Sequence, residues 1–165
     1  MLIKDIIDED FTNYKKVSMY IGTAICDFKC CKLANKDKSM CQNSEWINRP
    51  TIDIPNEAIV KRYIQNDMSE AVVFSGLEPF LQFSDMYHII SEIRKLSNDD
   101  IVIYTGYTKE EIKPYIDALK KIPNIIVKFG AFKPDDLESN SFTSHFDEVL
   151  GVQLASPNQY AEKIS

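Results

Sequence analysis

The sequence predicts an α/β fold, an open, partial (βα) barrel of about five parallel strands. Short apolar runs with little or no charge, rich in strand formers, alternate along the chain with segments whose apolar residues recur at helical spacing. The connections between these segments are short, which is typical of right-handed βαβ units. With 165 residues, of which 44% are hydrophobic, the chain can bury one core. We therefore expect a single domain over residues 1–165.

The expected elements follow one another in a regular order. Residues 1–16 are mixed in character, and Val17–Ile25 is the first expected strand. After an irregular connection, strands are expected over 71–74, 101–104, 125–129 and 149–154, and helices over 56–66, over 84–96 and from 108 onward. The polar segment 131–147 is expected to be a surface excursion.

Two of these helices have recognisable start signals. Ser84 can cap the second helix, and Thr108 with Glu111 can form a capping box for the third. Pro114 lacks a backbone donor, so we expect the third helix to be kinked or to start later.

Charge and hydropathy exclude several classes of function. The formal net charge of −6 argues against a nucleic-acid-binding surface, which normally needs a basic balance. No apolar run approaches the ~20 residues that span a bilayer, and the acidic N-terminal segment has no signal-peptide pattern. We therefore expect a cytoplasmic protein, without membrane or direct nucleic-acid binding, whose thiols stay reduced.

All four cysteines lie in one short window directly after the first expected strand. Three residues separate Cys26 from Cys30, Cys31 adjoins Cys30, and ten residues separate Cys30 from Cys41. In a reducing compartment such a cluster indicates metal binding or catalysis rather than a disulfide. Adjacent cysteines point in different directions, so three ligands and one spare thiol are the natural count. Three thiolates suit an iron–sulfur cluster with one open iron, whereas structural zinc usually takes four ligands.

Other side chains near the cysteines leave alternatives open. His88 is expected on a helix and His145 on the surface, so neither is favoured as a fourth ligand. Lysines 29, 32, 36 and 38 surround the thiols, either as a solvated loop or as a rim that attracts an anionic ligand or an acidic partner.

The segments that follow the expected strands should meet in space. In parallel α/β sheets the ligand site lies beyond the carboxyl ends of the strands. The cysteine window, Ser75–Pro79, Thr105–Tyr107 and Gly130 each follow one expected strand. The topology therefore predicts one cavity that all four segments line.

Several of these segments resemble the radical S-adenosylmethionine (SAM) enzymes. Cys26-Asp-Phe-Lys-Cys30 resembles the start of their Cys-x-x-x-Cys-x-x-Cys signature, and Ser75-Gly-Leu-Glu-Pro79 resembles their Gly-Gly-Glu-Pro segment. Tyr104-Thr-Gly-Tyr107, Cys41-Gln-Asn43 and Leu154-Ala-Ser-Pro-Asn-Gln159 are similar to segments of the small activators of anaerobic ribonucleotide reductase. The resemblance covers nearly the whole chain.

The resemblance implies both cofactors and site residues. Cys26, Cys30 and Cys41 would bind a 4Fe–4S cluster, whose open iron would chelate SAM. Reductive cleavage would then give a 5′-deoxyadenosyl radical that abstracts a hydrogen from a backbone glycine of a large glycyl-radical reductase. An electron donor such as flavodoxin or ferredoxin is implied as well. The SAM-side residues carried over are Phe28, Met40, Ser75, Gly76, Leu77, Glu78, Thr105, Gly106 and Gly130.

The chain also departs from the family pattern. The family has two residues between its second and third cysteines, so residues 31–40 would be an insertion, with Cys31 as the competing third ligand. Leu77 replaces the second glycine, which would be harmful if that position needs a positive φ. Phe28 and Met40 could instead be packing residues. These departures leave open a relative that acts on another peptide or nucleotide, or a non-catalytic metal-binding module.

Overall fold

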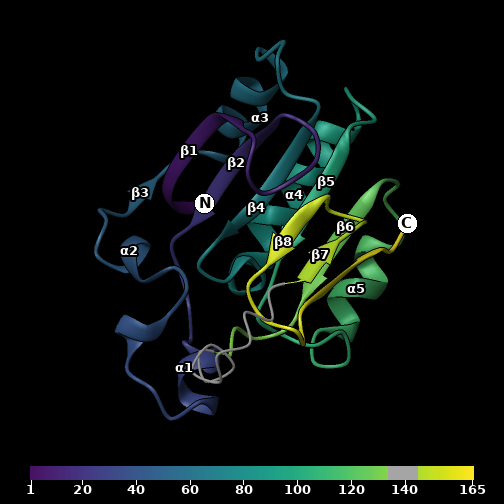
Figure 1. Ribbon diagram of the computed structural model, residues 1–165. Coiled ribbons are helices and arrows are strands. Elements are labelled where there is room, and N and C mark those ends of the chain that lie inside the picture. Colours follow the sequence, from purple (N-terminus) through teal and green to yellow (C-terminus); the bar gives the residue numbers. More distant parts are fainter. Residues whose placement is uncertain (134–144) are drawn as a thin grey trace.

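A computed structural model describes residues 1–133 and 145–165 of the chain, and it is a mixed α/β structure around one main sheet (Figure 1). This sheet has seven strands in the order β3-β1-β2-β4-β5-β6-β9, and a separate two-stranded sheet pairs β7 with β8. The longer helices cover one face of the main sheet, and the small β7–β8 sheet lies over the other (Figure 1).

The centre of the main sheet consists of four parallel strands. They are β2 (Ser18–Thr23), β4 (Ala71–Gly76), β5 (Asp100–Tyr104) and β6 (Ile125–Phe129). Each coincides with one of the charge-poor runs that predicted a strand, because a strand covered on both faces needs apolar side chains in both directions. The sheet is thus mostly parallel, with four parallel strands where the sequence predicts about five.

Antiparallel strands flank this centre on both sides. β1 (Leu2–Asp10) pairs with β2, β3 (Ile52–Asp53) pairs with β1, and β9 (Tyr160–Lys163) pairs with β6. The sequence pattern missed all three, because their exposed positions carry charged or polar residues and the apolar runs are broken. The expected last strand over 149–154 contains β8 (Val152–Leu154), which pairs with β7 (His145–Asp147) outside the main sheet. Of the expected excursion over 131–147, residues 134–144 lie outside the described residues.

The helices pack on one face of the main sheet and share an apolar core with its strands. The longer ones are α3 (Asn56–Ile64), α4 (Phe83–Arg94) and α5 (Lys113–Leu119), and the shorter ones are α1 (Lys29–Leu33), η1 (Lys38–Met40), α2 (Ser44–Ile47) and η2 (Pro79–Gln82). Buried residues of α3, α4 and α5, such as Ile59, Ile90 and Ile116, pack on the sheet. No helix among the residues with described positions is long and apolar enough to cross a membrane.

The two expected helix starts have different outcomes. Ser84 does not cap α4, because η2 runs directly into Phe83 and the helix begins there without a side-chain cap. Thr108 and Glu111 do form the two hydrogen bonds of a capping box. Thr108 N–H donates to the Glu111 carboxylate at 2.8 Å, and Glu111 N–H donates to Thr108 Oγ1 at 3.4 Å. However, α5 starts only at Lys113 and places Pro114 in its first turn, so the later start is confirmed.

The opposite face of the sheet changes from apolar to polar along the strands. A second apolar cluster includes Tyr20, Val73, Val102 and Leu154. Nearer the carboxyl ends, Ser75, Tyr104 and Lys128 line a pocket. The fold therefore places an open polar hollow where the four central strands end.

Candidate functional site

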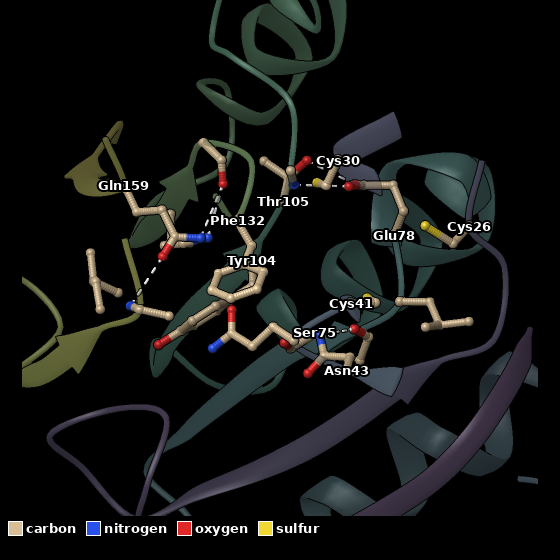
Figure 2. A pocket seen from close by; sticks show the side chains of 18 of the residues that line it. Cys26, Cys30, Cys41, Asn43, Ser75, Glu78, Tyr104, Thr105, Phe132 and Gln159 are labelled. Carbon is tan, nitrogen blue, oxygen red and sulfur yellow. Dashed lines mark hydrogen bonds between the residues drawn. The ribbon is translucent and has the colours of Figure 1, made fainter. Parts of the chain in front are cut away.

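One pocket collects the site residues that the sequence singled out. It lies at the carboxyl ends of β2, β4, β5 and β6, and Figure 2 shows its side chains. Its lining includes Cys26, Phe28, Cys30, Met40, Cys41, Ser75, Gly76, Leu77, Glu78, Thr105, Gly106 and Gly130. The structure thus brings these residues together, while their roles as ligands stay predictions.

Three of the thiols reach the pocket from different parts of the window. Cys26 lies in the loop after β2, and its sulfur accepts a hydrogen bond from Phe28 N–H at 3.2 Å. Cys30 lies in α1, and its sulfur accepts a hydrogen bond from the backbone N–H of Phe132. Cys41 follows η1 directly. Backbone N–H groups that point at cysteine sulfurs are typical of iron–sulfur sites, where they stabilise the thiolate charge.

Cys31 is the fourth thiol of the pocket wall. It is 7% exposed, and its thiol forms a hydrogen bond with the thiol of Cys41. Cys31 and Cys41 are therefore neighbours in space, and position alone does not separate the two assignments of the third ligand.

Burial favours the protonated form of the Cys26, Cys30 and Cys31 thiols. It raises the pKa of Cys26 to about 12 and raises the pKa values of Cys30 and Cys31 as well. A bound metal must therefore displace their protons, as metal sites generally do.

The donors in this pocket are chiefly thiols, and Cys26, Cys30 and Cys41 line one hollow. Over residues 1–133 and 145–165, no three His, Cys, Asp or Glu side chains gather closely enough to hold a single metal ion. Thiolates are the usual protein ligands of iron–sulfur clusters, so the chemistry of this donor set fits such a group.

Glu78 connects the turn after β4 to the turn after β5. Glu78 is 5% exposed, and its carboxylate accepts hydrogen bonds from Thr105 Oγ1 at 2.8 Å and Gly106 N–H at 2.9 Å (Figure 2). It also accepts a hydrogen bond from Phe80 N–H at 3.2 Å. Burial raises the pKa of Glu78 to about 7, although all three hydrogen bonds favour the charged form. Glu78 therefore orients both turns around the pocket.

Gly76, and not position 77, needs to be glycine. Gly76 has a φ of +82°, and a Cβ built there would lie 2.9 Å from Gly22 Cα. Leu77 is not among the non-glycine residues with positive φ in the described chain. Position 77 therefore does not need the positive φ that would favour glycine over leucine. Asn43, whose side chain donates to the Gly76 carbonyl, was not among the predicted site residues.

A clamp holds the cysteine loop against the turn after β5. Tyr107 Oη donates to the Asp27 carboxylate at 2.8 Å, and the Lys29 ammonium pairs with Glu111 and lies 4.9 Å from the centre of the Tyr107 ring. Gly106 lies beneath Cys30, since a Cβ on this glycine would stand 2.7 Å from the sulfur. Sequence reasoning missed the clamp, because its partners are some 80 positions apart.

Three further pocket residues were also missed. Tyr104, Lys128 and Gln159 also line the pocket. Gln159 is 2% exposed and donates to the Gly130 carbonyl at 3.2 Å. Tyr104 and Gln159 lie in segments whose resemblance was noted, although neither was chosen as a site residue, and the signal for Lys128 was a lysine inside the otherwise apolar run Ile125–Phe129.

Comparison with known proteins gave one match. A family model described as a 4Fe-4S single cluster domain matches residues 15–146, which include the whole cysteine window and all four central strands. No curated protein and no solved structure matches the chain significantly.

Proposed function

This chain belongs to the 4Fe-4S single cluster domain family, and we propose that it is a radical SAM enzyme of the glycyl-radical activating type. The observation that carries the proposal is the shared pocket. The cysteine thiols, the Ser75–Glu78 turn, the Thr105–Gly106 turn and Gly130 surround one hollow at the ends of the parallel strands. We propose further that the sheet curves as the partial (βα) barrel of such enzymes.

We assign Cys26, Cys30 and Cys41 as the ligands of the 4Fe–4S cluster. The donor set supports this, because the thiols line one open pocket and two of them already accept backbone hydrogen bonds. The absence of a side chain at Gly106 lets the Cys30 sulfur pack directly against the turn after β5, which holds this proposed ligand in place. Three protein ligands would leave one iron free for a cofactor.

SAM would bind in the pocket between the cysteines, which would hold the cluster, and the carboxyl ends of the four central strands. When bound, the cluster and SAM would supply a 5′-deoxyadenosyl radical by reductive cleavage, and the cofactors carry that chemistry. The chain's own residues orient the groups around them. Asn43 fixes the carbonyl of Gly76, and Glu78 fixes the turn that contains Thr105 and Gly106. The ring centres of Trp46 and Tyr20 lie 5.4 Å apart, and Trp46 packs against the second apolar cluster of the sheet, which includes Tyr20.

The proposed substrate is a backbone glycine of a large anaerobic ribonucleotide reductase. The proposed electron donor is a small redox protein such as flavodoxin or ferredoxin. Its docking face would be the lysine-rich outer side of the cysteine loop, residues 29–38, because such donors are commonly acidic. We propose a cytoplasmic location, where the thiols stay reduced.

The test uses anaerobically reconstituted full-length protein. Iron, sulfide and zinc are quantified, the EPR spectrum of the dithionite-reduced protein is recorded with and without SAM, and 5′-deoxyadenosine is assayed. The Cys41→Ser variant is the matched control. We expect a 4Fe–4S signal that shifts on SAM addition, with 5′-deoxyadenosine formed by the wild type only.

Each alternative predicts a different result. Zinc without iron, or a cluster whose signal ignores SAM, would contradict the enzyme and favour a metal-binding module. SAM cleavage without a glycyl-radical EPR signal in a co-incubated anaerobic ribonucleotide reductase would favour an enzyme that acts on another peptide or nucleotide.

A further inference from the structure

Cys31 and Cys41 form a pair of free thiols in the pocket wall. Their thiols share a hydrogen bond, and Cys31 is buried while Cys41 is partly exposed. The sulfurs of Cys26 and Cys30 accept hydrogen bonds from backbone N–H groups instead. Cys31 and Cys41 are therefore the two thiols best placed to react with each other.

The nine residues between these cysteines form a loop that folds back on itself. α1 ends before Asn35, which has a left-handed φ of +51°, and the Lys36 N–H donates to the Cys31 carbonyl at 3.0 Å. At the other end of the loop, the Cys41 N–H donates to the Lys38 carbonyl at 3.0 Å. Because the fold already holds the two ends together, a bond between the sulfurs costs little further loop-closure entropy.

The neighbouring cysteine is a poor partner for Cys31. Cys30 and Cys31 are consecutive residues of α1, so their side chains point roughly 100° apart around the helix axis. A disulfide needs its two Cβ atoms about 3.5–4.5 Å apart, with the sulfurs turned toward each other. The Cys30 sulfur instead packs against Gly106. The geometry therefore favours a bond between positions 31 and 41.

We propose that Cys31 and Cys41 form a reversible redox modification site, whose disulfide closes when the proposed cluster is absent. The oxidant is a small disulfide such as oxidised glutathione. The thiolate of Cys41, the more exposed of the two, attacks this disulfide, becomes a mixed disulfide and releases one small thiolate. Cys31 then attacks the Cys41 sulfur and releases the second. Two protein thiols are thereby oxidised, and the two small thiolates take up their protons.

The disulfide and the proposed cluster exclude each other. Iron binds cysteine as a thiolate, and a sulfur in a disulfide no longer supplies one. The exclusion holds whether Cys41 or Cys31 is the third ligand, because the disulfide consumes both. The inference therefore rests on the 4Fe–4S cluster of the proposed function, but on neither SAM nor the substrate.

The first test treats cluster-free, full-length protein with oxidised glutathione and counts its free thiols after denaturation. We expect four free thiols before treatment, two after it, and four again after dithiothreitol. Peptide mass spectrometry locates the link. Trypsin leaves Cys30 and Cys31 in one peptide, so variants must separate them. Cys31→Ala should lose the link and keep glutathione on Cys41, whereas Cys30→Ala, the matched control, should still form the link. Circular dichroism verifies that both variants fold.

The second test compares cluster-free and reconstituted wild type in the same oxidised glutathione. The reconstituted protein should keep its iron and form the disulfide at least about tenfold more slowly, because a bound ligand withdraws the reactive form. Since coupling between two events is reciprocal, this protection also measures how strongly the disulfide opposes the cluster.

Three results would overturn the inference, namely four free thiols after oxidation, a link between other cysteines, or equal rates with and without the cluster. The proposed function fails separately. A protein that protects its thiols with a cluster but does not cleave SAM would contradict the proposed enzyme and keep the redox site. A wild type that loads no iron would contradict the cluster, whereas the thiol count would still decide whether the disulfide forms.

Discussion

The sulfur of Cys30 rests directly on the backbone of Gly106, so closely that a Cβ on this glycine would stand 2.7 Å from it. The residues belong to α1 and to the turn after β5, and the contact fixes one proposed cluster ligand against the sheet. Since φ at Gly106 is not in the left-handed range, the requirement for glycine is one of space alone.

Gly106→Ala should therefore displace Cys30 and destabilise the protein. Overpacking of this kind costs about 1–3 kcal/mol of unfolding free energy. Urea unfolding measures that cost, and iron content should fall in parallel. Adding Cys30→Ala removes the sulfur, so Gly106→Ala should be nearly neutral in that background. A penalty that persists in the double variant would show that the crowding involves other atoms.

The cysteine assignment predicts an asymmetric set of serine variants. We expect a large loss of cluster retention in each of three variants, Cys26→Ser, Cys30→Ser and Cys41→Ser. Removing only a hydrogen-bond partner of a metal ligand typically lowers metal affinity by roughly 10- to 100-fold, and removing the ligand itself should lower it by more. Cys31→Ser should keep the cluster, because our assignment makes Cys31 the spare thiol. Iron and sulfide analysis after gel filtration measures retention. Loss in Cys31→Ser with retention in Cys41→Ser would reverse the assignment.

Loosening the clamp should expose the cysteine loop to protease. Tyr107→Phe removes the hydrogen bond to Asp27, which contributes about 1 kcal/mol because the pair is only partly buried. Its loss should make the population of molecules with a detached cysteine loop about fivefold larger. Trypsin cleavage between Lys29 and Lys38 should accelerate by a similar factor. Tyr115→Phe is the control, since the Tyr115 hydroxyl has no hydrogen-bond partner in the described structure. Equal cleavage rates in both variants would rule out the clamp.

Asp100 predicts a pH-dependent contribution to stability far from the pocket. Burial alone would raise the pKa of Asp100, but hydrogen bonds from Lys16 at 2.6 Å and Tyr14 at 3.0 Å outweigh it and hold the pKa below its usual value. A lowered native pKa stabilises the fold above the unfolded pKa of about 3.9, and this stabilisation disappears as the pH falls through the native value.

Lys16→Met should therefore lower the free energy of unfolding by about 1 kcal/mol near pH 6 and by much less near pH 3. The effect is small because the lysine is partly exposed to solvent. Urea unfolding at both pH values measures the difference, with Lys121→Met, an exposed lysine after α5, as the control. A cost of the same size at both pH values would mean that Lys16 acts through packing instead.

The central strands could be predicted from the sequence because burial on both faces excludes charge from most of their length. The rule that ligand sites follow the carboxyl ends of parallel strands then led to the Ser75–Glu78 and Thr105–Gly106 turns. β1 and β9 could not be predicted in the same way. They lie outside the parallel centre and are less buried than its strands, so acidic and basic residues interrupt their apolar residues.

Residue type alone predicted a site residue only where the side chain is itself an unusual chemical group, such as a thiol. The thiols are conspicuous in any sequence, whereas Asn43 and Tyr107 matter through partners that only the fold brings near. Lys128 shows the opposite case. A lysine within an apolar strand conflicts with the strand pattern, and the conflict is resolved because its side chain faces the polar hollow.

The separation of the thiols from their clamp also has a consequence for biosynthesis. All four cysteines precede residue 42, while Gly106, Tyr107, Glu111 and Phe132 are synthesised much later. A nascent chain therefore carries every thiol long before the frame that holds them exists, because that frame needs β5 and β6 to join the sheet. We expect iron capture to be a late, post-translational event, and the emerging thiols to depend on cellular reductants until the chain is complete.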